Sequence, residues 1–389
     1  MSTSKPYDLS RSLTALEQDT TLVAVIEMSQ SNWLVAGMVP GVERRPLKKL
    51  GPDAAGLLQL LHRWRQEAER VGRVIQRISV AYEAGRDGFW LARSLWTHSV
   101  EAYVIHPNSV AVSRERRRAK SDQLDTEQLM RAFVGWLRGE RRHCQMVAIP
   151  TIEEEDAKRP NREREGLVKD RTRLVNRIKA TLARFGIRNF KPLRRAEERL
   201  TTLRTAEGML LPPLTLQEVH RDLARLRLVR EQIKALEAAR VRRLKQAAVN
   251  SRPRAMVRLL ARVMGIGIET ADMLVSEVLS RTLRDQRAVA RYAGLTGAPD
   301  ESGNRRREKA LTRAGNARVR RGMIQLAWRV LQFQKDSALV QWYWARTADG
   351  RGSTRKTMIV ALARKLLVAL WRMVTTGEMP AGFVLRPAV

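Results

Sequence analysis

The sequence predicts a mixed α/β domain followed by two helical regions. Short β-branched runs alternate with amphipathic helical patterns up to about residue 150, and long charged segments with a narrow apolar stripe follow. The last third of the chain is again helical in pattern. We therefore expect an α/β domain at 22–150, a coiled-coil or helical linker domain at 151–250 and a helical domain at 251–380.

The first domain should be a sheet flanked by helices. Its expected strands are short apolar runs bounded by turn residues, at 22–27, 32–39, 73–82 and 101–105, and a further strand could follow near Pro46. Its expected helices carry apolar residues at helical spacing, at 53–70, at 88–97 and from near Asp122. The first two strands are separated by a polar turn, which predicts a hairpin, and the whole order predicts a mixed sheet.

The middle region carries two apolar stripes between charged residues. The first consists of Leu167, Leu174, Ile178, Leu182 and Phe185, and the second of Val219, Leu223, Leu226, Val229, Ile233 and Leu236. Narrow stripes of this kind are typical of coiled coils. The Pro212-Pro213 loop separates them, so the pair could fold back on itself or engage another subunit. We expect the second stripe to bury against another subunit, because it is too narrow for a domain core.

The last region contains a Gly265-Ile266-Gly267 turn between two expected helices. It resembles a helix-hairpin-helix, whose backbone N–H groups can hold a phosphate, and a plain helical hairpin without a ligand is an equal alternative. A Gly- and Pro-rich segment at 297–304 then precedes helices that we expect to continue to about residue 375.

The charge balance points to a polyanionic partner. The chain has 73 Lys and Arg against 40 Asp and Glu, a formal net charge of +33. Such an excess repels itself unless nucleic acid or an anionic membrane neutralises it. The longest apolar stretch, 358–374, is interrupted by Arg364, Lys365 and Arg372, which indicates a buried amphipathic helix. We therefore expect DNA or RNA as the partner, and no membrane.

The expected location is the bacterial-type cytoplasm, in association with the nucleoid. The N-terminal residues lack the apolar segment of a signal peptide. The single Cys144 cannot form an internal disulfide, and only His143 lies near it as another soft ligand, so structural zinc is not expected.

Four carboxylates have the pattern of a metal-dependent nucleic-acid enzyme. Asp122 and Asp125 form a D-x-x-D pair that opens an expected helix, and Glu27 and Glu83 end two expected strands. Together they could hold two Mg²⁺ ions, with Mn²⁺ as a substitute, for phosphodiester displacement. Taken singly, each acid is better explained as a polar strand end or a solvated helix start, and it is the order of all four that favours a metal site. The preceding basic run offers phosphate contacts through Arg116, Arg117, Arg118 and Lys120.

Ser302 is a candidate nucleophile. Gly303 permits an exposed tight turn beside it, and Arg305, Arg306 and Arg307 can bind a phosphate. No His lies nearby for a hydrolase triad. The tripeptide around Ser302 is also compatible with an ordinary surface turn.

Several separated motifs occur in one order along nearly the whole chain. They are the strand ending in Glu27, Ala81-Tyr82-Glu83-Ala84-Gly85, Lys120-Ser121-Asp122-Gln123-Leu124-Asp125, Gly265-Ile266-Gly267, Tyr292-Ala293-Gly294-Leu295, Ser302-Gly303 and Arg313-Ala314-Gly315-Asn316-Ala317-Arg318-Val319-Arg320. In this order the sequence resembles the DEDD transposases of the insertion-sequence family one-ten.

The resemblance implies a RuvC/RNase H-like domain, a coiled-coil middle and a C-terminal domain with a catalytic serine. Glu27, Glu83, Asp122 and Asp125 would then be the metal tetrad, and Ser302 would form a phosphoserine link to DNA. It also implies a structured noncoding guide RNA, donor and target DNA, and a homo-oligomer, dimer or tetramer, with a composite active site. The family's first acid is usually Asp, whereas this chain has Glu27.

Beside this RNA-guided recombinase, two functions remain open. A RuvC-like junction nuclease would use metal-activated water and leave Ser302 as a bystander. A non-catalytic basic nucleic-acid-binding protein would account for the charge alone. The basic runs at 114–120 and 305–321, which includes Arg318 and Arg320, are expected to contribute most to binding.

Overall fold

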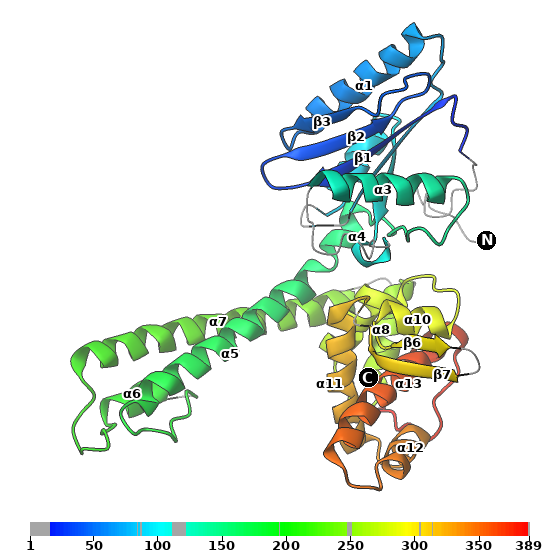
Figure 1. Cartoon of the computed structure of the whole chain (residues 1–389). Coiled ribbons are helices and arrows are strands. Elements are labelled where there is room, and N and C mark those ends of the chain that lie inside the picture. The colour runs from blue at the N-terminus through cyan, green and yellow to red at the C-terminus, as the bar shows by residue number, and fades with distance from the viewer. Residues whose placement is uncertain are drawn as a thin grey trace. The chain divides into compact units, whose positions relative to one another are not determined.

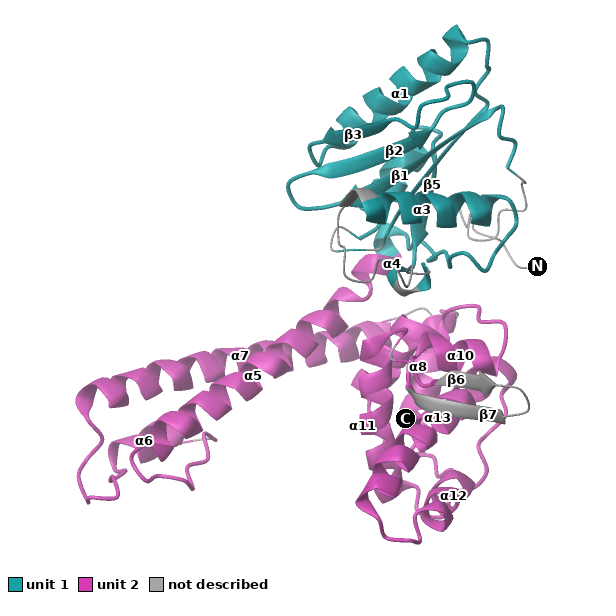
Figure 2. Cartoon of the chain, viewed as in Figure 1, with its two compact units in different colours: residues 1–153 teal, residues 154–389 magenta. Residues whose placement is uncertain are grey.

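The structure is a computed structural model of the chain (Figure 1). It describes residues 16–83, 85, 88–110, 122–193, 195–246, 251–302, 305–312 and 314–387, with the side chains of residues 108, 122, 123, 298–302 and 305–310 outside the description. The chain falls into two compact units, residues 1–153 and 154–389 (Figure 2). The separation of 151–250 from 251–380 as two domains stays a prediction.

Unit 1 is built on a five-stranded mixed sheet of order β3-β2-β1-β4-β5. Its strands are β1 (Thr21–Met28), β2 (Trp33–Met38), β3 (Leu47–Leu50), β4 (Arg77–Glu83) and β5 (Glu101–Ile105). β1 and β2 form the expected antiparallel hairpin, β3 adds to its edge, and β4 and β5 run parallel to β1. The prediction of a mixed sheet is confirmed.

Helices cover both faces of this sheet, which buries β1 almost completely. Side chains alternate along a strand, so Leu22, Ala24 and Ile26 face one side, where α1 (Ala54–Arg70) and α2 (Trp90–Thr97) pack. Val23 and Val25 face the other side, where α3 (Asp122–Leu137) packs. Figure 1 shows α1 and α3 on opposite faces of the sheet. A strand buried on both sides is continuously apolar, as β1 is from residue 22 to residue 26.

Unit 2 begins with a helical hairpin, called the arm here (154–246). Its two long helices are α5 (Arg159–Ala183) and α7 (Pro213–Gln246), which lie side by side (Figure 1), and α6 (Ala196–Thr201) is short. The short helix α4 (Ile152–Asp156) crosses the boundary between the units. The two apolar stripes meet in one core that contains Leu174, Ile178, Leu182, Val219, Leu223 and Leu226.

The expectation that the second stripe buries against another subunit is therefore wrong for most of its length. Leu226 is 0% exposed and Val219 is 1% exposed within the single chain. The loop between the helices is long enough for α7 to turn back along α5, and a two-helix seam inside the chain satisfies the same narrow apolar pattern. Whether the arm has coiled-coil packing stays a prediction.

The rest of unit 2 is a helical bundle (251–387). It contains α8 (Arg252–Arg262), α9 (Ile268–Leu274), the π-helical turn η3 (Val275–Leu279), α10 (Gln286–Tyr292), α11 (Ala317–Phe333), α12 (Ala338–Arg346) and α13 (Gly352–Thr376). α11 and α13 pack together over a core that includes Met323, Leu326, Leu366 and Leu370.

One part of the bundle differs from the expectation of continuous helices. Residues 297–302 and 305–311 form an antiparallel hairpin of β6 (Gly297–Ser302) and β7 (Arg305–Leu311). The charged run Arg305-Arg306-Arg307 has no apolar alternation that would identify a strand. The sequence does contain a hairpin signal, because the Gly303-Asn304 pair lies between the two segments. That pair could have predicted the hairpin.

Within the residues that the structure describes, none of the helices has an apolar run long enough to cross a bilayer.

Candidate active site

Glu27 and Glu83 lie next to each other at the carboxyl ends of neighbouring parallel strands. Ile26 of β1 pairs with Tyr82 of β4, so the glutamates follow in register. Ile26 and Tyr82 belong to the core on the α1 and α2 side. By the alternation of side chains, both glutamates are directed to the opposite side, which α3 covers. This edge of a parallel sheet is where α/β proteins commonly place their ligands.

Asp125 lies on the same side of the sheet, on α3. Leu129, Phe133 and Trp136, which lie one and more turns further along this helix, are buried against the sheet. Residues spaced by three or four share one helix face, so Asp125 in the first turn faces the sheet as well. Asp125 is partly buried, as are Glu27 and Glu83.

The electrostatics show that Glu83 and Asp125 are close. Burial raises the pKa of the Glu83 carboxyl above its ordinary value, and the negative charge of Asp125 raises it further. Two carboxylates held together in a partly dry place repel each other, and a divalent cation relieves that repulsion. Oxygen ligands of this kind fit Mg²⁺ or Mn²⁺ better than zinc. Glu83 and Asp125 are therefore a pair of ligands of the chemical type that the acid pattern predicts for a metal.

Tyr82, which directly precedes Glu83, is bonded to Gly88 and to α2 through its hydroxyl. The Tyr82 hydroxyl donates to the carbonyl oxygen of Gly88 at 3.1 Å and accepts from the Ala92 N–H at 3.2 Å. A buried tyrosine hydroxyl with both bonds made gives the end of β4 a defined position.

The tetrad as a whole stays a prediction. Among the described side chains, no three His, Cys, Asp or Glu are close enough together to hold a metal ion. Asp122 is the first residue of α3, but its side chain lies outside the described residues, as do Arg116, Arg117, Arg118 and Lys120. Glu27, Glu83 and Asp125 are thus placed on one face of the sheet, and the fourth acid is placed by its backbone alone.

Ser302 is the last residue of β6 and pairs with Arg305 of β7. Only two residues connect the strands, so the serine stands at the tip of the hairpin. Its side chain and those of Arg305, Arg306 and Arg307 lie outside the described residues. Their chemical roles stay predictions.

The root of this hairpin, where residues 291–296 meet residues 312–316, is a close backbone contact between two of the sequence motifs. Gly315 has φ of +106°, and a Cβ there would lie 2.6 Å from the carbonyl oxygens of Arg291 and Tyr292. Gly294 has φ of +64°, and its Cβ would clash with the carbonyl oxygen of Ala314. Only glycine fits both requirements. The two glycine motifs are therefore explained by the way in which the hairpin joins the bundle.

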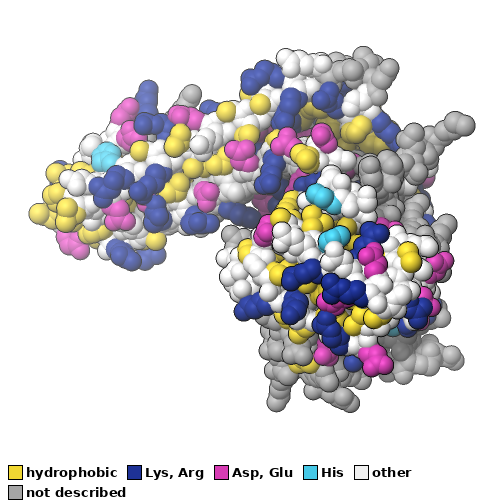
Figure 3. Space-filling view, turned by 90° about the horizontal axis from the view of Figure 1, so that it is seen from above, with side chains coloured by type: hydrophobic (Ala, Val, Ile, Leu, Met, Phe, Trp, Pro, Cys, Tyr) yellow, Lys and Arg dark blue, Asp and Glu magenta, His cyan; other side chains and the backbone are white. Residues whose placement is uncertain are grey.

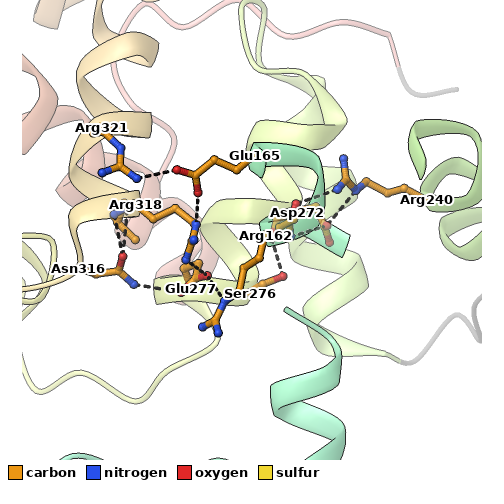
Figure 4. Close-up of polar contacts among 11 residues, drawn as sticks. Arg162, Glu165, Arg240, Asp272, Ser276, Glu277, Asn316, Arg318 and Arg321 are labelled. Carbon is orange, nitrogen blue, oxygen red and sulfur yellow. Dashed lines mark hydrogen bonds and ion pairs between the residues drawn. The ribbon is translucent and has the colours of Figure 1, made fainter. Parts of the chain in front are cut away.

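A group of charged side chains and one asparagine, called the polar cluster here, is linked by hydrogen bonds and ion pairs (Figure 4). Its members come from α5, η3 and the start of α11, and they are Arg162, Glu165, Glu277, Asn316, Arg318 and Arg321. Sequence reasoning missed the cluster, because its residues are far apart in the chain. The Asn that precedes a helix was an available capping signal for Asn316.

Glu165 holds two arginines of α11. It accepts from Arg318 and, at 2.6 Å, from Arg321. Burial alone would raise the pKa of the Glu165 carboxyl, but the hydrogen bonds from Arg318 and Lys169 outweigh it and lower the pKa to about 2. The Arg318 guanidinium also lies 3.4 Å from Glu277. Arg318 thus has two internal carboxylate partners, and its expected contact with nucleic acid stays a prediction.

Arg320 and the Gly265-Ile266-Gly267 turn are also engaged inside unit 2. The Arg320 side chain packs against Gly294 at the hairpin root. Gly265 has φ of +91° and packs on Phe333, and Gly267 precedes α9 with the Glu269 carboxylate beside it. A carboxylate at that place repels phosphate. The prediction that this turn holds a phosphate is untested, as is its assignment to the helix-hairpin-helix class.

Basic side chains are also spread along the arm, which the sequence reasoning did not single out. Figure 3 shows Lys and Arg in dark blue over this part of the molecule. Exposed examples on α5 and α7 are Arg171, Arg173, Lys179, Arg221 and Arg227. A row of cations on paired helices suits a phosphate backbone.

Comparisons with known proteins show which family the chain resembles. A family model described as "Transposase IS116/IS110/IS902 family" matches residues 257–342, and a model for the DEDD part of IS110 elements, described as "Transposase", matches residues 43–206. The chain is 42% identical to a Sinorhizobium fredii protein named "Putative transposase y4rJ", over 96% of this chain and 97% of the relative. It is 25% identical to a Coxiella burnetii protein named "Transposase for insertion sequence element IS1111A", over 67% of this chain and 68% of the relative.

Proposed function

The chain belongs to the IS110 family of transposases, and from that premise we propose that it cleaves and exchanges DNA strands through a phosphoserine intermediate. Family membership makes it an insertion-sequence transposase, an enzyme that acts on DNA. The intermediate, the metal and the guide RNA are our proposals.

The observation that carries the proposal is the meeting of Glu83 and Asp125 on the α3 side of the sheet, with Glu27 beside Glu83. These acids, with Asp122, would hold divalent metal ions, which would stabilise the charge that develops at a scissile phosphate. Glu27 has the same charge as the usual aspartate, and its side chain is longer by one methylene. The RuvC/RNase H-like assignment of unit 1 rests on this arrangement and on the sheet order.

Ser302 would act as the nucleophile. Its Oγ attacks the phosphorus, the Oγ–P bond forms as the bond to a deoxyribose oxygen breaks, and the proton of the serine hydroxyl passes to solvent or to an acceptor in the site. The released deoxyribose oxygen takes up a proton. The phosphoserine ester keeps the energy of the phosphodiester, so a second DNA end can reverse the step without a nucleotide cofactor. Arg305, Arg306 and Arg307 would neutralise the phosphate.

The partners would be donor and target DNA and a structured guide RNA. The net charge of +33 and the exposed basic residues of the arm support a large polyanionic ligand. We propose that the acids of one subunit and the serine of another complete the active site in a dimer or tetramer.

Trapping of the protein–DNA adduct tests this function. Purified protein is incubated with its element ends, copurified RNA and Mg²⁺, and adducts are resolved on a denaturing gel. Wild type and Ser353→Ala, which changes an exposed serine at the start of α13, should form the adduct, and Ser302→Ala should not. Cleavage by Ser302→Ala without any adduct would favour the junction nuclease. Intact DNA with the wild type would favour the non-catalytic binding protein.

A further inference from the structure

We infer that Glu277 is a positioning residue for the reaction assigned to Ser302, and that it acts through Asn316 at the root of the β6–β7 hairpin. The inference rests on the proposed function, because it concerns the place of the serine. Glu277 lies in η3 and Asn316 directly before α11 (Figure 4).

Asn316 uses three of its polar groups at once. Its main-chain N–H donates to the Tyr292 carbonyl oxygen at 2.6 Å, which closes the root of the hairpin. Its Oδ1 caps α11 by accepting from the N–H groups of Arg318 at 3.0 Å and Val319 at 3.2 Å. Its Nδ2 donates to Oε2 of Glu277 at 3.0 Å. Because the Asn316 side-chain oxygen is used to cap the helix, only the side-chain amide N–H groups remain to fix the orientation of the side chain. Glu277 accepts the hydrogen bond from that amide.

Glu277 is itself held firmly. Its side chain is 4% exposed, and Arg162 and Arg318 lie 3.7 Å and 3.4 Å from its Oε1. A buried carboxylate with cationic partners on one oxygen and an amide on the other is a fixed acceptor. The π-helical turn that presents it is a rare conformation, often found at functional sites. The cluster therefore joins α5, η3 and α11 at the point from which the hairpin emerges.

Because the hairpin is long, a small change of orientation at its root displaces Ser302 by a larger distance. Thr312 and Thr296 are still paired at the root through an N–H···O bond of 3.2 Å, and Ser302 ends β6. At a rise of about 3.3 Å per residue, five steps from Gly297 to Ser302 span roughly 17 Å. A tilt of about 4° at the root moves the tip by roughly 1 Å, and a misplacement of about 1 Å can cost about 100-fold in rate.

An exchange of donor and acceptor tests the inference. Asn316→Asp keeps the oxygen that caps α11 but sets a second carboxylate against Glu277. In the double variant with Glu277→Gln, the glutamine amide can donate to the carboxylate introduced at position 316, which restores one hydrogen bond with reversed polarity. We expect Asn316→Asp to slow adduct formation by about 10- to 100-fold at saturating DNA, with DNA affinity unchanged, and the double variant to recover most of the rate.

Two further variants separate positioning from stability. Glu277→Asp keeps the charge that Arg162 and Arg318 need but withdraws the carboxylate from Asn316, so its adduct rate should also fall. Glu165→Gln removes another carboxylate of the polar cluster that has no bond to Asn316, so its melting temperature should fall while its adduct rate at a temperature where it is folded stays near the wild-type rate.

The possible failures are distinct. A wild-type adduct rate in folded Asn316→Asp, or no recovery in the double variant, overturns the positioning role and leaves the serine mechanism standing. A loss of rate in Glu165→Gln equal to that in Glu277→Asp shows a purely structural cluster and also overturns it. An adduct formed by Ser302→Ala, measured in parallel, overturns the proposed function and this inference together.

Discussion

The negative charge of Asp125 on α3 raises the pKa of Glu83 at the end of β4, in addition to the effect of burial. The two acids come from different elements and meet over the sheet because α3 presents the face that also carries Leu129 and Phe133. Such a pair has little structural use by itself, since like charges held together destabilise the fold. A divalent cation bound between them would relieve this repulsion, which is why we propose that these acids hold a metal.

Replacing Asp125 by Asn should abolish strand cleavage and leave nucleic-acid affinity unchanged or slightly raised. Loss of the carboxylate weakens metal binding, while the neutral amide no longer repels phosphate. Cleavage of labelled element ends and a filter-binding isotherm measure the two effects. Glu127→Gln is the matched control, because Glu127 is on the exposed side of the same helix. Cleavage at the wild-type rate by Asp125→Asn would remove this residue from the metal site.

Magnesium should stabilise the protein more strongly as the pH rises through the acid range. The folded pKa of Glu83 is raised above the ordinary value of 4.5, so the folded state keeps a proton that the unfolded state has lost. Without metal, the stability contribution of Glu83 therefore falls as the pH rises from 4.5 through the folded pKa, and the penalty is complete above that pKa. Bound Mg²⁺ offsets the penalty where the carboxylate is ionised.

The measurement is the melting temperature against pH, with and without Mg²⁺, for wild type and Glu83→Gln. The difference between the two proteins without metal should grow with pH in favour of the variant, and the Mg²⁺ effect should be lost in the variant. A Mg²⁺ shift independent of pH and equal in both proteins would argue that the ion binds elsewhere.

Low pH should weaken the ion pairs of Glu165 on α5 with Arg318 and Arg321 on α11. The pKa of Glu165 is lowered to about 2 from an ordinary value of 4.5, so its contribution is fully present above pH 4.5 and is lost as the pH falls toward 2. A shift of this size corresponds to about 3 kcal/mol as an upper figure. Glu165→Gln should flatten the acid limb of the stability curve, as followed by urea unfolding at several pH values. Asp170→Asn, on the same helix and half-exposed, should leave the curve unchanged.

Much of unit 1 could be predicted because its strands are buried. The apolar run of β1 and its polar turn to β2 identify the hairpin, and the acids at the carboxyl ends of β1 and β4 follow buried apolar residues. Register could not be read from the sequence, so the side-by-side placement of Glu27 and Glu83 required the structure. It depends on the pairing of Ile26 with Tyr82.

Unit 2 could be predicted less well, and the reasons are physical. The strands β6 and β7 contain mostly charged and turn residues, so no period-two apolar pattern distinguishes them from a loop or a helix. The residues of an apolar stripe do not show what packs against it. Another subunit and a second helix of the same chain would give the same pattern. Contacts such as that of Asn316 with Glu277 join residues 39 positions apart, which local patterns do not reveal.

Truncation of Leu226 should destabilise the single chain instead of separating subunits. Its side chain is 0% exposed between α5 and α7, so Leu226→Ala should cost roughly 2 to 5 kcal/mol in free energy of unfolding from lost burial and the resulting cavity. Leu228 is 56% exposed on the same helix, so Leu228→Ala is the matched control and should change stability by less than about 0.5 kcal/mol. Chemical unfolding gives both values, and light scattering gives the mass of each protein. If Leu226→Ala halved the mass without loss of stability, the stripe would belong to a subunit interface after all.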